Sequence, residues 1–176
     1  MNLYIALLRG INVSGHKKFP KAEQLQMISN LGFQKAQVYI HTGNWIFSAS
    51  EGVSEVKTKI ENAILATYGW EIPVLVLKTS EVEQIFKACP FSEEIKEQSY
   101  FTLLNSTPPK AYIDALIQLE YKNEEFHVTS NCIYIFYKNG AGAAKFTNNV
   151  IERKLKVSAT SRNFRTMAKL INLASS

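Results

Sequence analysis

The stretch AQVYIHTGNWIFSA, residues 36–49, decides the fold expected for the first half of this chain. Apolar runs lie on both sides of Thr42-Gly43, and such a pair between two runs predicts a tight turn joining two strands. The expected strands cover residues 36–41 and 44–49. A second stretch, FHVTSNCIYIFY at residues 126–137, repeats this pattern around Ser130-Asn131 and predicts a second hairpin.

The elements expected around the two hairpins follow the same order in both halves. In the first half they are a strand at Leu3–Leu8, a helix at Lys21–Leu31, the hairpin, a helix at Val53–Tyr68 and a strand at Glu71–Lys78. In the second half they are a strand at Tyr100–Leu104, a helix from Pro109 to Leu119, the hairpin, a helix at Ala143–Leu155, a strand at Val157–Thr160 and a helix at Arg162–Ala174.

This repeated order predicts the α+β class, with two tandem ferredoxin-like (βαββαβ) halves and antiparallel or mixed sheets. Each half is expected to be followed by a helix. We place the halves at residues 1–92 and 98–176, because the intervening residues are polar and charged.

The positive charge of the chain is localised. The 176 residues carry a net charge of +5, but residues 138–176 alone carry +7. Residues 9–21 contain four basic side chains and no acidic one. Localised charge of this kind suggests an anionic partner, and ordinary solvated surface is the alternative.

The apolar runs and the cysteines predict a cytoplasmic protein. No apolar run reaches the length of a membrane span, so we expect no membrane partner and no signal peptide. Cys89 and Cys132 lie far apart in the sequence and lack metal-ligand spacing. Two unpaired thiols are typical of a reduced compartment, and we expect neither a metal nor a cofactor.

Topology predicts a first cluster of polar residues. In a βαββαβ plait the first strand ends beside the turn between the second and third, and the connection that follows it here is basic. Its glycines allow backbone amides to approach an anion. Gly10 and Gly15 have Walker A spacing, but His16 stands where the lysine should follow, so we expect no triphosphate loop. The candidate ligand-binding residues are Arg9, Gly10, Asn12, Gly15, Lys18, Thr42, Gly43 and Asn44.

The same reasoning predicts a second cluster in the second half. Its third and fourth strands run in the same direction, so residues 139–145 and 160–163 should share one edge of the sheet. Both segments then open helices, whose free amides favour negative charge. The candidate residues are Gly140, Gly142, Lys145, Thr160, Arg162 and Asn163. Functionally silent turns are the alternative for both clusters.

Four stretches resemble signatures of the domain-of-unknown-function 1697 family. They are LLRGINV at residues 7–13, YIHTGN at 39–44, GAGAAKFT at 140–147 and TSRN at 160–163. The resemblance implies a tandem α/β protein of bacterial type, with no activity that could be carried over. Its characteristic residues fall within the two predicted clusters. Ala144 stands where the family usually has serine, which removes a hydroxyl from the second cluster.

Three functions are compatible with these features. The first is an uncharacterised cytosolic anion-binding protein that binds nucleic acid, a nucleotide or another small anion through the basic loops. Strand aromatics such as Tyr4, Trp45 and Tyr134 could stack bases, although core packing is the alternative and no RNP signature is present.

The second function is an enzyme acting on a small phosphorylated or carboxylated substrate. His41 is the candidate catalytic residue, with His16 in the facing loop, but neither signature contains a carboxylate to orient them. The third is a non-catalytic protein-interaction module. The sequence makes no prediction of the oligomeric state.

Overall fold

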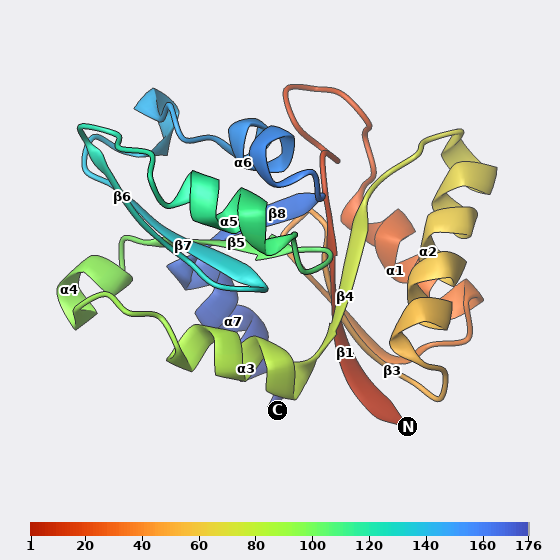
Figure 1. Cartoon of the computed structure of the whole chain (residues 1–176). Helices are drawn as coiled ribbons and strands as arrows, with labels where there is room; N and C mark the ends of the chain where they lie inside the picture. The colour runs from red at the N-terminus through yellow and green to blue at the C-terminus, as the bar shows by residue number, and fades with distance from the viewer. Residues whose placement is uncertain (176) are drawn as a thin grey trace. The chain divides into compact units, whose positions relative to one another are not determined.

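The computed structural model describes residues 1–175, which divide into two compact units (Figure 1). The first comprises residues 1–84 together with the segment from Lys169 to the C-terminus, and the second comprises Ile85–Ala168. The sequence predicts a division at residues 93–97, whereas the observed division falls within α3 (Thr79–Lys87). The units are therefore divided inside a helix and not at the polar linker.

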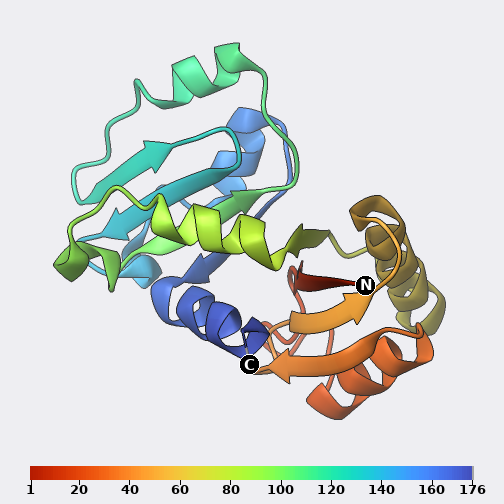
Figure 2. The same cartoon turned by 90° about the horizontal axis from the view of Figure 1, so that it is seen from below.

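The first unit has the βαββαβ order. Its elements are β1 (Asn2–Leu8), α1 (Lys21–Asn30), β2 (Gln34–Tyr39), β3 (Asn44–Ala49), α2 (Val53–Tyr68), β4 (Val74–Lys78) and the beginning of α3. The strands form one sheet in the order β2-β3-β1-β4, and all neighbouring pairs are antiparallel. Helices α1 and α2 pack on the same face of this sheet (Figure 2).

The second unit repeats that order. Its elements are α4 (Glu93–Lys96), β5 (Tyr100–Leu104), α5 (Lys110–Leu116), β6 (Glu124–Val128), β7 (Cys132–Tyr137), η1 (Ala141–Ala143), α6 (Asn148–Leu155), β8 (Ala159–Asn163) and α7 (Phe164–Ala174). The sheet order is β6-β7-β5-β8, again with antiparallel pairs, and α5 and α6 share one face. The predicted α+β class is therefore confirmed, with two antiparallel sheets in the strand order expected of a ferredoxin-like plait.

An apolar core joins the sheet of the first unit to its helices. Trp45 and Phe47 are both fully buried on the helical face because side chains alternate along β3. The buried residues of α2 recur at helical spacing: Val56, Ile60 and Ile64. One polar group enters this core, since Trp45 Nε1 donates to Oε1 of the buried Gln24 at 2.7 Å. Gln24 connects the core to the loop that precedes α1.

Aromatic rings fill the core of the second unit. Phe146 is fully buried, with its ring centroid 4.3 Å from that of Phe126 and 5.1 Å from that of Tyr121. Ile151 and Leu155 of α6 belong to the same cluster. Phe146 therefore fixes the segment before α6 against the edge strand β6.

Two elements of the second unit differ from their predicted positions. The helix expected from Ala143 begins at Asn148, after the η1 turn and Thr147, whose hydroxyl accepts from Val150 N at 3.4 Å. The strand expected at residues 157–160 lies at Ala159–Asn163, because Lys156 ends α6 in a left-handed conformation with φ of 57°. Arg162 and Asn163 therefore belong to a strand, and Asn163 also caps the first turn of α7 by accepting from Thr166 N.

Candidate anion-binding site

The connection after β1 meets the turn between β2 and β3, as the topology predicts. Leu8 N donates to Gly43 O at 2.8 Å. Gly43 has a φ of +82°, and a Cβ added to it would lie 2.6 Å from Leu8 Cβ and 3.0 Å from Ile11 Cδ1. Backbone conformation and available space both require glycine at this position. The loop and the turn are in direct contact through this residue.

The side chain of Asn12 holds the base of the loop through hydrogen bonds to backbone groups. Its Oδ1 accepts from Phe19 N at 2.8 Å, and its Nδ2 donates to Phe19 O at 2.8 Å and to His41 O at 2.5 Å. Gln24 Nε2 donates to the same two carbonyl oxygens, at 2.8 and 3.0 Å. The Asn12 amide, predicted to bind a ligand, is therefore engaged in bonds that shape the loop.

Asn44 and Thr42 belong to the internal hydrogen bonding of the turn. Asn44 is fully buried, and its Nδ2 donates to Tyr39 O at 3.2 Å and to Thr42 Oγ1 at 3.1 Å. A buried amide without partners would cost about 1–3 kcal/mol, so the fold explains this residue type. Arg9 is half-buried next to this turn, and its backbone amide donates to Pro73 O at 3.2 Å. The predicted neighbours do meet, but Asn44 points inward.

The outer part of the loop, residues 14–18, is exposed except for the half-buried Lys17; it has an unusual backbone, and we call it the basic tip. Positive φ angles occur at Gly10, Asn12, Ser14, Gly15 and Lys17. At the start of the tip His16 N donates to Val13 O at 2.9 Å, and these two residues form an isolated antiparallel bridge. Ser14 and Gly15 are both exposed, and their amides have no hydrogen-bond partner within residues 1–175. Within residues 1–175, Lys17 and Lys18 have no ion-pair partner.

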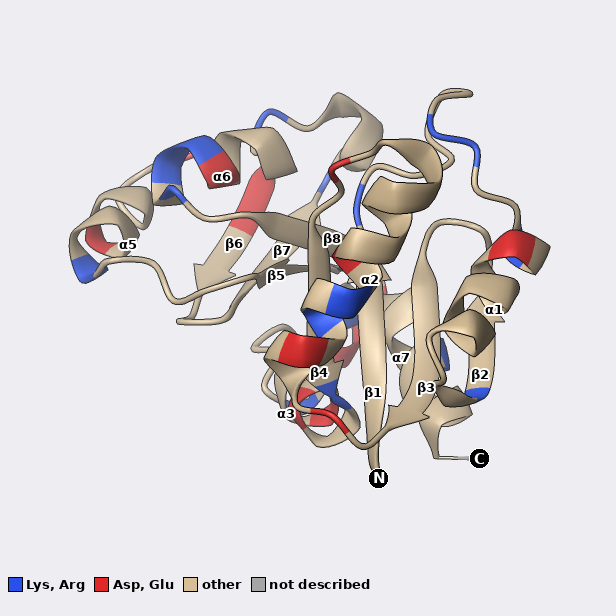
Figure 3. Ribbon diagram, turned by 90° about the vertical axis from the view of Figure 1, so that its right-hand side faces the viewer, with Lys and Arg blue, Asp and Glu red and all other residues tan. Residues whose placement is uncertain are grey.

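Charge is distributed unevenly around this loop. Lys17 and Lys18 lie on the tip, Lys21 opens α1, and the first acidic residue after them is Glu23 in the first turn of α1. Figure 3 shows Lys and Arg in blue on the loop before α1 and Asp and Glu in red on the first turn of that helix. Free amides and lysine side chains on one exposed segment form a donor surface that suits an anion.

The two histidines lack the partners that acid–base catalysis needs. His41 and His16 are both exposed, and His41 is held through its main-chain oxygen. Within residues 1–175, neither imidazole has a carboxylate at hydrogen-bond distance. A general base is usually oriented by such a group. The geometry therefore gives no support to the catalytic role expected for His41.

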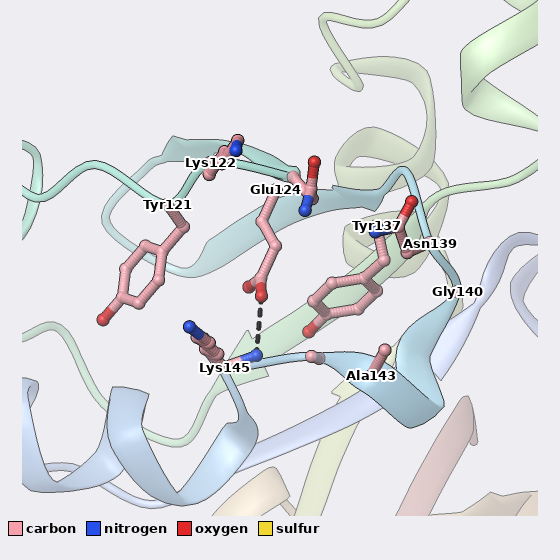
Figure 4. A pocket seen from close by; sticks show the side chains of 10 residues that line it. Tyr121, Lys122, Glu124, Tyr137, Asn139, Gly140, Ala143 and Lys145 are labelled. Carbon is pink, nitrogen blue, oxygen red and sulfur yellow. Dashed lines mark hydrogen bonds between the residues drawn. The ribbon is translucent and has the colours of Figure 1, made fainter.

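In the second cluster, the loop amides already hold an internal carboxylate. Glu124 Oε1 accepts from Lys145 N at 2.6 Å, and Oε2 accepts from Phe146 N at 2.7 Å. Figure 4 shows Glu124 pointing from β6 onto this segment, beside a cavity of about 120 Å³. The expected position of a bound anion is thus occupied by a side chain of the protein.

Tyr137 lines the same cavity. Its hydroxyl donates to Phe146 O at 3.0 Å. Burial raises the pKa of Tyr137 to about 12, and the negative charge of Glu124 acts in the same direction. The phenol is therefore kept neutral beside the Glu124 carboxylate. Tyr137 and Glu124 both hydrogen-bond to the backbone of the segment that precedes α6.

The remaining residues of the second cluster are spread across the sheet. Lys145 is held at β6 by Glu124, whereas Thr160, Arg162 and Asn163 lie on β8. These strands are the two edges of the sheet, separated by three strand spacings, or about 14 Å. Ser161 Oγ donates to Asn148 Oδ1 on the α6 side, so its neighbours in β8 point to the other face. The structure therefore does not bring Lys145 and Arg162 together.

Other members of that cluster have local structural roles. Asn163 Oδ1 accepts from Thr166 N at 2.9 Å at the start of α7. Gly140 has a φ of +78° and precedes the η1 turn, which contains Gly142. Thr160 is buried on β8. The bond at Asn163 and the positive φ of Gly140 explain those two residue types, whereas the buried hydroxyl of Thr160 has no hydrogen-bond partner within residues 1–175.

Sequence reasoning missed three residues that shape these loops: Gln24, Glu124 and Tyr137. Gln24 left a detectable signal, because it lies three and four residues before Met27 and Ile28 on the buried stripe of α1. A polar residue on an apolar stripe indicates a buried hydrogen bond. Glu124 left no such signal, since it stands in a polar stretch next to Glu125.

Residues 1–175 offer few features of a metal, membrane or thiol site. Within residues 1–175, no group of three or more His, Cys, Asp or Glu side chains could hold a metal ion. None of the helices described there has both the length and the apolar character needed to cross a membrane. Cys89 and Cys132 are buried free thiols, and burial raises the pKa of Cys132. A buried neutral thiol is a poor nucleophile.

Comparisons with known proteins identify a family but no activity. No curated protein matches the chain. The solved structure of a conserved bacterial protein, SP0830 from Streptococcus pneumoniae, matches with 23% identity, coverage of 98% of each chain and a TM-score of 0.79. At this identity the likeness shows the fold alone. The family model described as "Protein of unknown function (DUF1697)" matches residues 1–134 and ends before the GAGAAKFT segment. The chain therefore belongs to this family of proteins of unknown function.

Proposed function

We propose that the chain binds phosphate groups of a nucleic acid or nucleotide through the basic tip. One observation carries the proposal: the tip combines the unpartnered amides of the exposed residues Ser14 and Gly15 with Lys17 and Lys18. Backbone amides in a loop with left-handed residues form a concave donor surface for anions. Lysine adds the point charge that phosphate binding commonly uses.

The base of the loop supports this proposal because it is fixed without any ligand. Asn12 and Gln24 hold Phe19 O and His41 O, and Gly43 packs against Leu8. An ordered loop loses less conformational entropy on binding than a mobile one. The side chains predicted to touch the ligand would thus act indirectly, by presenting the tip.

Because the strand aromatics are buried, the proposed binding involves contacts to phosphates and no stacking of bases on these rings. Tyr4, Trp45 and Tyr134 are each at most 1% exposed, so they cannot stack with bases. Contacts limited to phosphates carry no direct sequence information and depend strongly on salt. We therefore expect binding with little base preference.

The test measures binding of a labelled single-stranded oligonucleotide of about 16 nucleotides by fluorescence anisotropy at several salt concentrations. If Lys17, Lys18 and Lys21 each contact a phosphate, the slope of log K against log salt should be about −2. The Lys17→Ala/Lys18→Ala variant should lower the size of that slope by about 1.4, because each lost contact removes about 0.7.

A control variant with the same loss of charge distinguishes binding at the basic tip from nonspecific electrostatic attraction. Lys57→Ala/Lys110→Ala removes the same charge from α2 and α5, where each lysine forms an exposed ion pair. It should leave the slope nearly unchanged. The basic tip would be excluded as the site if both double variants reduced the salt slope equally. It would also be excluded if neither the oligonucleotide nor a nucleoside triphosphate bound to the chain at low salt.

A further inference from the structure

Two stacked aromatic rings of the first unit remain partly accessible at the end of α2. Tyr68 is the last residue of this helix, Trp70 follows after one residue, and both are half-buried. Their ring centroids lie 4.4 Å apart, with an interplanar angle of 13°. Gly69 between them is left-handed, with a φ of 69°, and its amide donates to Leu65 O at 2.8 Å. This helix end reverses the chain and brings Trp70 back onto Tyr68.

A third ring connects this stack to the loop that carries the basic tip. Phe19 directly follows Lys18, the last residue of the tip, and its ring centroid lies 4.9 Å from that of Tyr68. Phe19 is fully buried, and the Asn12 side chain holds both its backbone amide and its carbonyl. Figure 1 shows the loop before α1 and the end of α2 at the same end of the first unit. Two successive ring contacts therefore lead from the basic tip to Trp70.

Trp70 is the accessible end of this row of rings. Within residues 1–175, its indole contacts no aromatic ring other than Tyr68 and no cation. Its Nε1 has no hydrogen-bond acceptor in that range, where the buried side-chain atoms without a partner belong to Asn105 and Thr160. The indole N–H is therefore open to solvent. The ring also packs against the core of the first unit, which holds it in place without covering it.

The charges around the rings favour the uncharged part of a nucleotide at this position. Tyr68 OH donates to Glu23 Oε2 at 2.5 Å, and the exposed Glu71 directly follows Trp70. Carboxylates at these two positions repel phosphate, whereas the lysines of the basic tip attract it. A nucleotide that contacts both surfaces would therefore place its phosphates on the tip and its base on the indole.

We propose that Trp70 stacks with a base of the nucleotide or nucleic acid whose phosphates bind the basic tip. This inference rests on the proposed function and adds a contact that phosphate binding does not supply. Stacking of one base on an aromatic side chain strengthens binding by about fivefold or more. Every base has a π face, so the added contact retains the low base preference expected of the tip.

The test compares two pairs of ligands that differ in whether they carry bases. Calorimetry compares a nucleoside triphosphate with inorganic tripolyphosphate, and fluorescence anisotropy compares the labelled oligonucleotide with an abasic one of equal length. Trp70→Leu keeps an apolar side chain and removes the ring. It should weaken binding of the base-containing ligands at least about fivefold and change binding of the base-free ligands less than about twofold. A loss confined to one pair identifies a free nucleotide or a nucleic acid as the ligand.

Two further variants control for the chemistry of the substitution. Trp70→Phe retains a ring and should keep most of the affinity for the base-containing ligands. Tyr112→Leu removes a ring that is 41% exposed on α5, in the second unit, and should leave binding of all four ligands unchanged. Equal weakening by Tyr112→Leu and Trp70→Leu would overturn the assignment of stacking to Trp70.

Tryptophan fluorescence of the unmodified chain gives a second readout that needs no altered core. A base stacked on the indole of Trp70 should quench its emission when the nucleoside triphosphate is added, and tripolyphosphate should not. Trp45 is fully buried and cannot stack with a base, so this quenching should be lost in Trp70→Phe. If Trp70→Leu has altered circular dichroism, quenching decides: its absence in the unmodified chain with bound nucleoside triphosphate overturns the stacking.

Failure of this inference and failure of the proposed function give different results. Stacking is overturned, and the basic tip retained, if Trp70→Leu binds all ligands normally while Lys17→Ala/Lys18→Ala lowers the salt slope as expected. Absence of binding by all four ligands at low salt overturns both proposals.

Discussion

The loop after β1 and the loop after β7 combine the same ingredients, glycine and lysine, and are built in opposite ways. The first is braced at its base by Asn12 and Gln24, and its tip presents amides to solvent. The second turns two consecutive amides inward onto Glu124. A glycine- and lysine-rich loop is therefore an anion site only if the protein does not supply its own acceptor.

The largest expected effect is the loss of folding stability when Gly43, in the turn that contacts the first loop, is replaced. Gly43→Ala should lower the free energy of unfolding by about 3 kcal/mol, because its φ of +82° is left-handed and its new Cβ would lie 2.6 Å from Leu8 Cβ. Urea denaturation measures this. Gly142→Ala is the matched control, since no atom lies within 4 Å of its added Cβ, and its effect should stay within about 0.5 kcal/mol. Similar losses of unfolding free energy in Gly43→Ala and Gly142→Ala would show that the first loop is held no more tightly than the second.

Removing the internal acceptor should make the second loop resemble the first. Glu124→Ala should cost about 2 kcal/mol of stability, because two charge-assisted hydrogen bonds are lost. Acetate should then raise the melting temperature of this variant, at constant ionic strength, more than that of the unmodified chain. Glu120→Ala removes an exposed carboxylate from the same region and is the control. No response to acetate would mean that these amides cannot accept a carboxylate from solution.

The smallest effect concerns alkaline pH. The pKa of Tyr137 is raised to about 12, first by burial and then by Glu124, so the folded chain keeps this proton longer than the unfolded chain. The raised pKa therefore contributes to the stability of the folded chain. This contribution is fully present below pH 10 and is lost as the pH approaches 12. Tyr137→Phe should lose about 1 kcal/mol at neutral pH with its bond to Phe146 O, and should show a shallower decline above pH 10.

Denaturation of both proteins at several pH values measures this difference. Part of the decline should remain in the variant, because the pKa of Tyr68 is also raised to about 12, mainly by burial. Identical slopes in the two proteins would show that Tyr137 ionises equally readily in both states. The second loop would then lack the buried environment that distinguishes it from the first.

Local pattern predicted the architecture well, because hairpins and amphipathic helices depend on nearby residues. The strands at Asn44–Ala49 and Tyr100–Leu104 and the helix at Val53–Tyr68 lie at their predicted positions. The meeting of the β1 connection with Gly43 followed from topology. The second unit was harder to predict, because the helix expected at Ala143 is displaced by a contact from Glu124, nineteen residues earlier in the chain.

The candidate site shows where such reasoning ends. The positions of Asn12 and Asn44 were predictable from topology, but the direction of their side chains was not. An exposed asparagine that binds a ligand and one that bonds to distant backbone carbonyls have the same local sequence. The separation of Lys145 from Arg162 likewise depends on which face each side chain of β8 occupies, and a shift of the predicted strand changes that face.

The hydrogen bond between Trp45 and Gln24 gives the first unit a built-in optical reporter. Gln24 Nε2 bonds to Phe19 O and His41 O, the carbonyls that Asn12 also holds. A shift of the loop would therefore alter the environment of the buried indole and with it the emission wavelength. Trp70, the other tryptophan, stacks on Tyr68 with centroids 4.4 Å apart. Replacing Trp70 with phenylalanine would leave a single tryptophan, whose emission can be excited selectively over that of the tyrosines, and ligand screening would need no added dye.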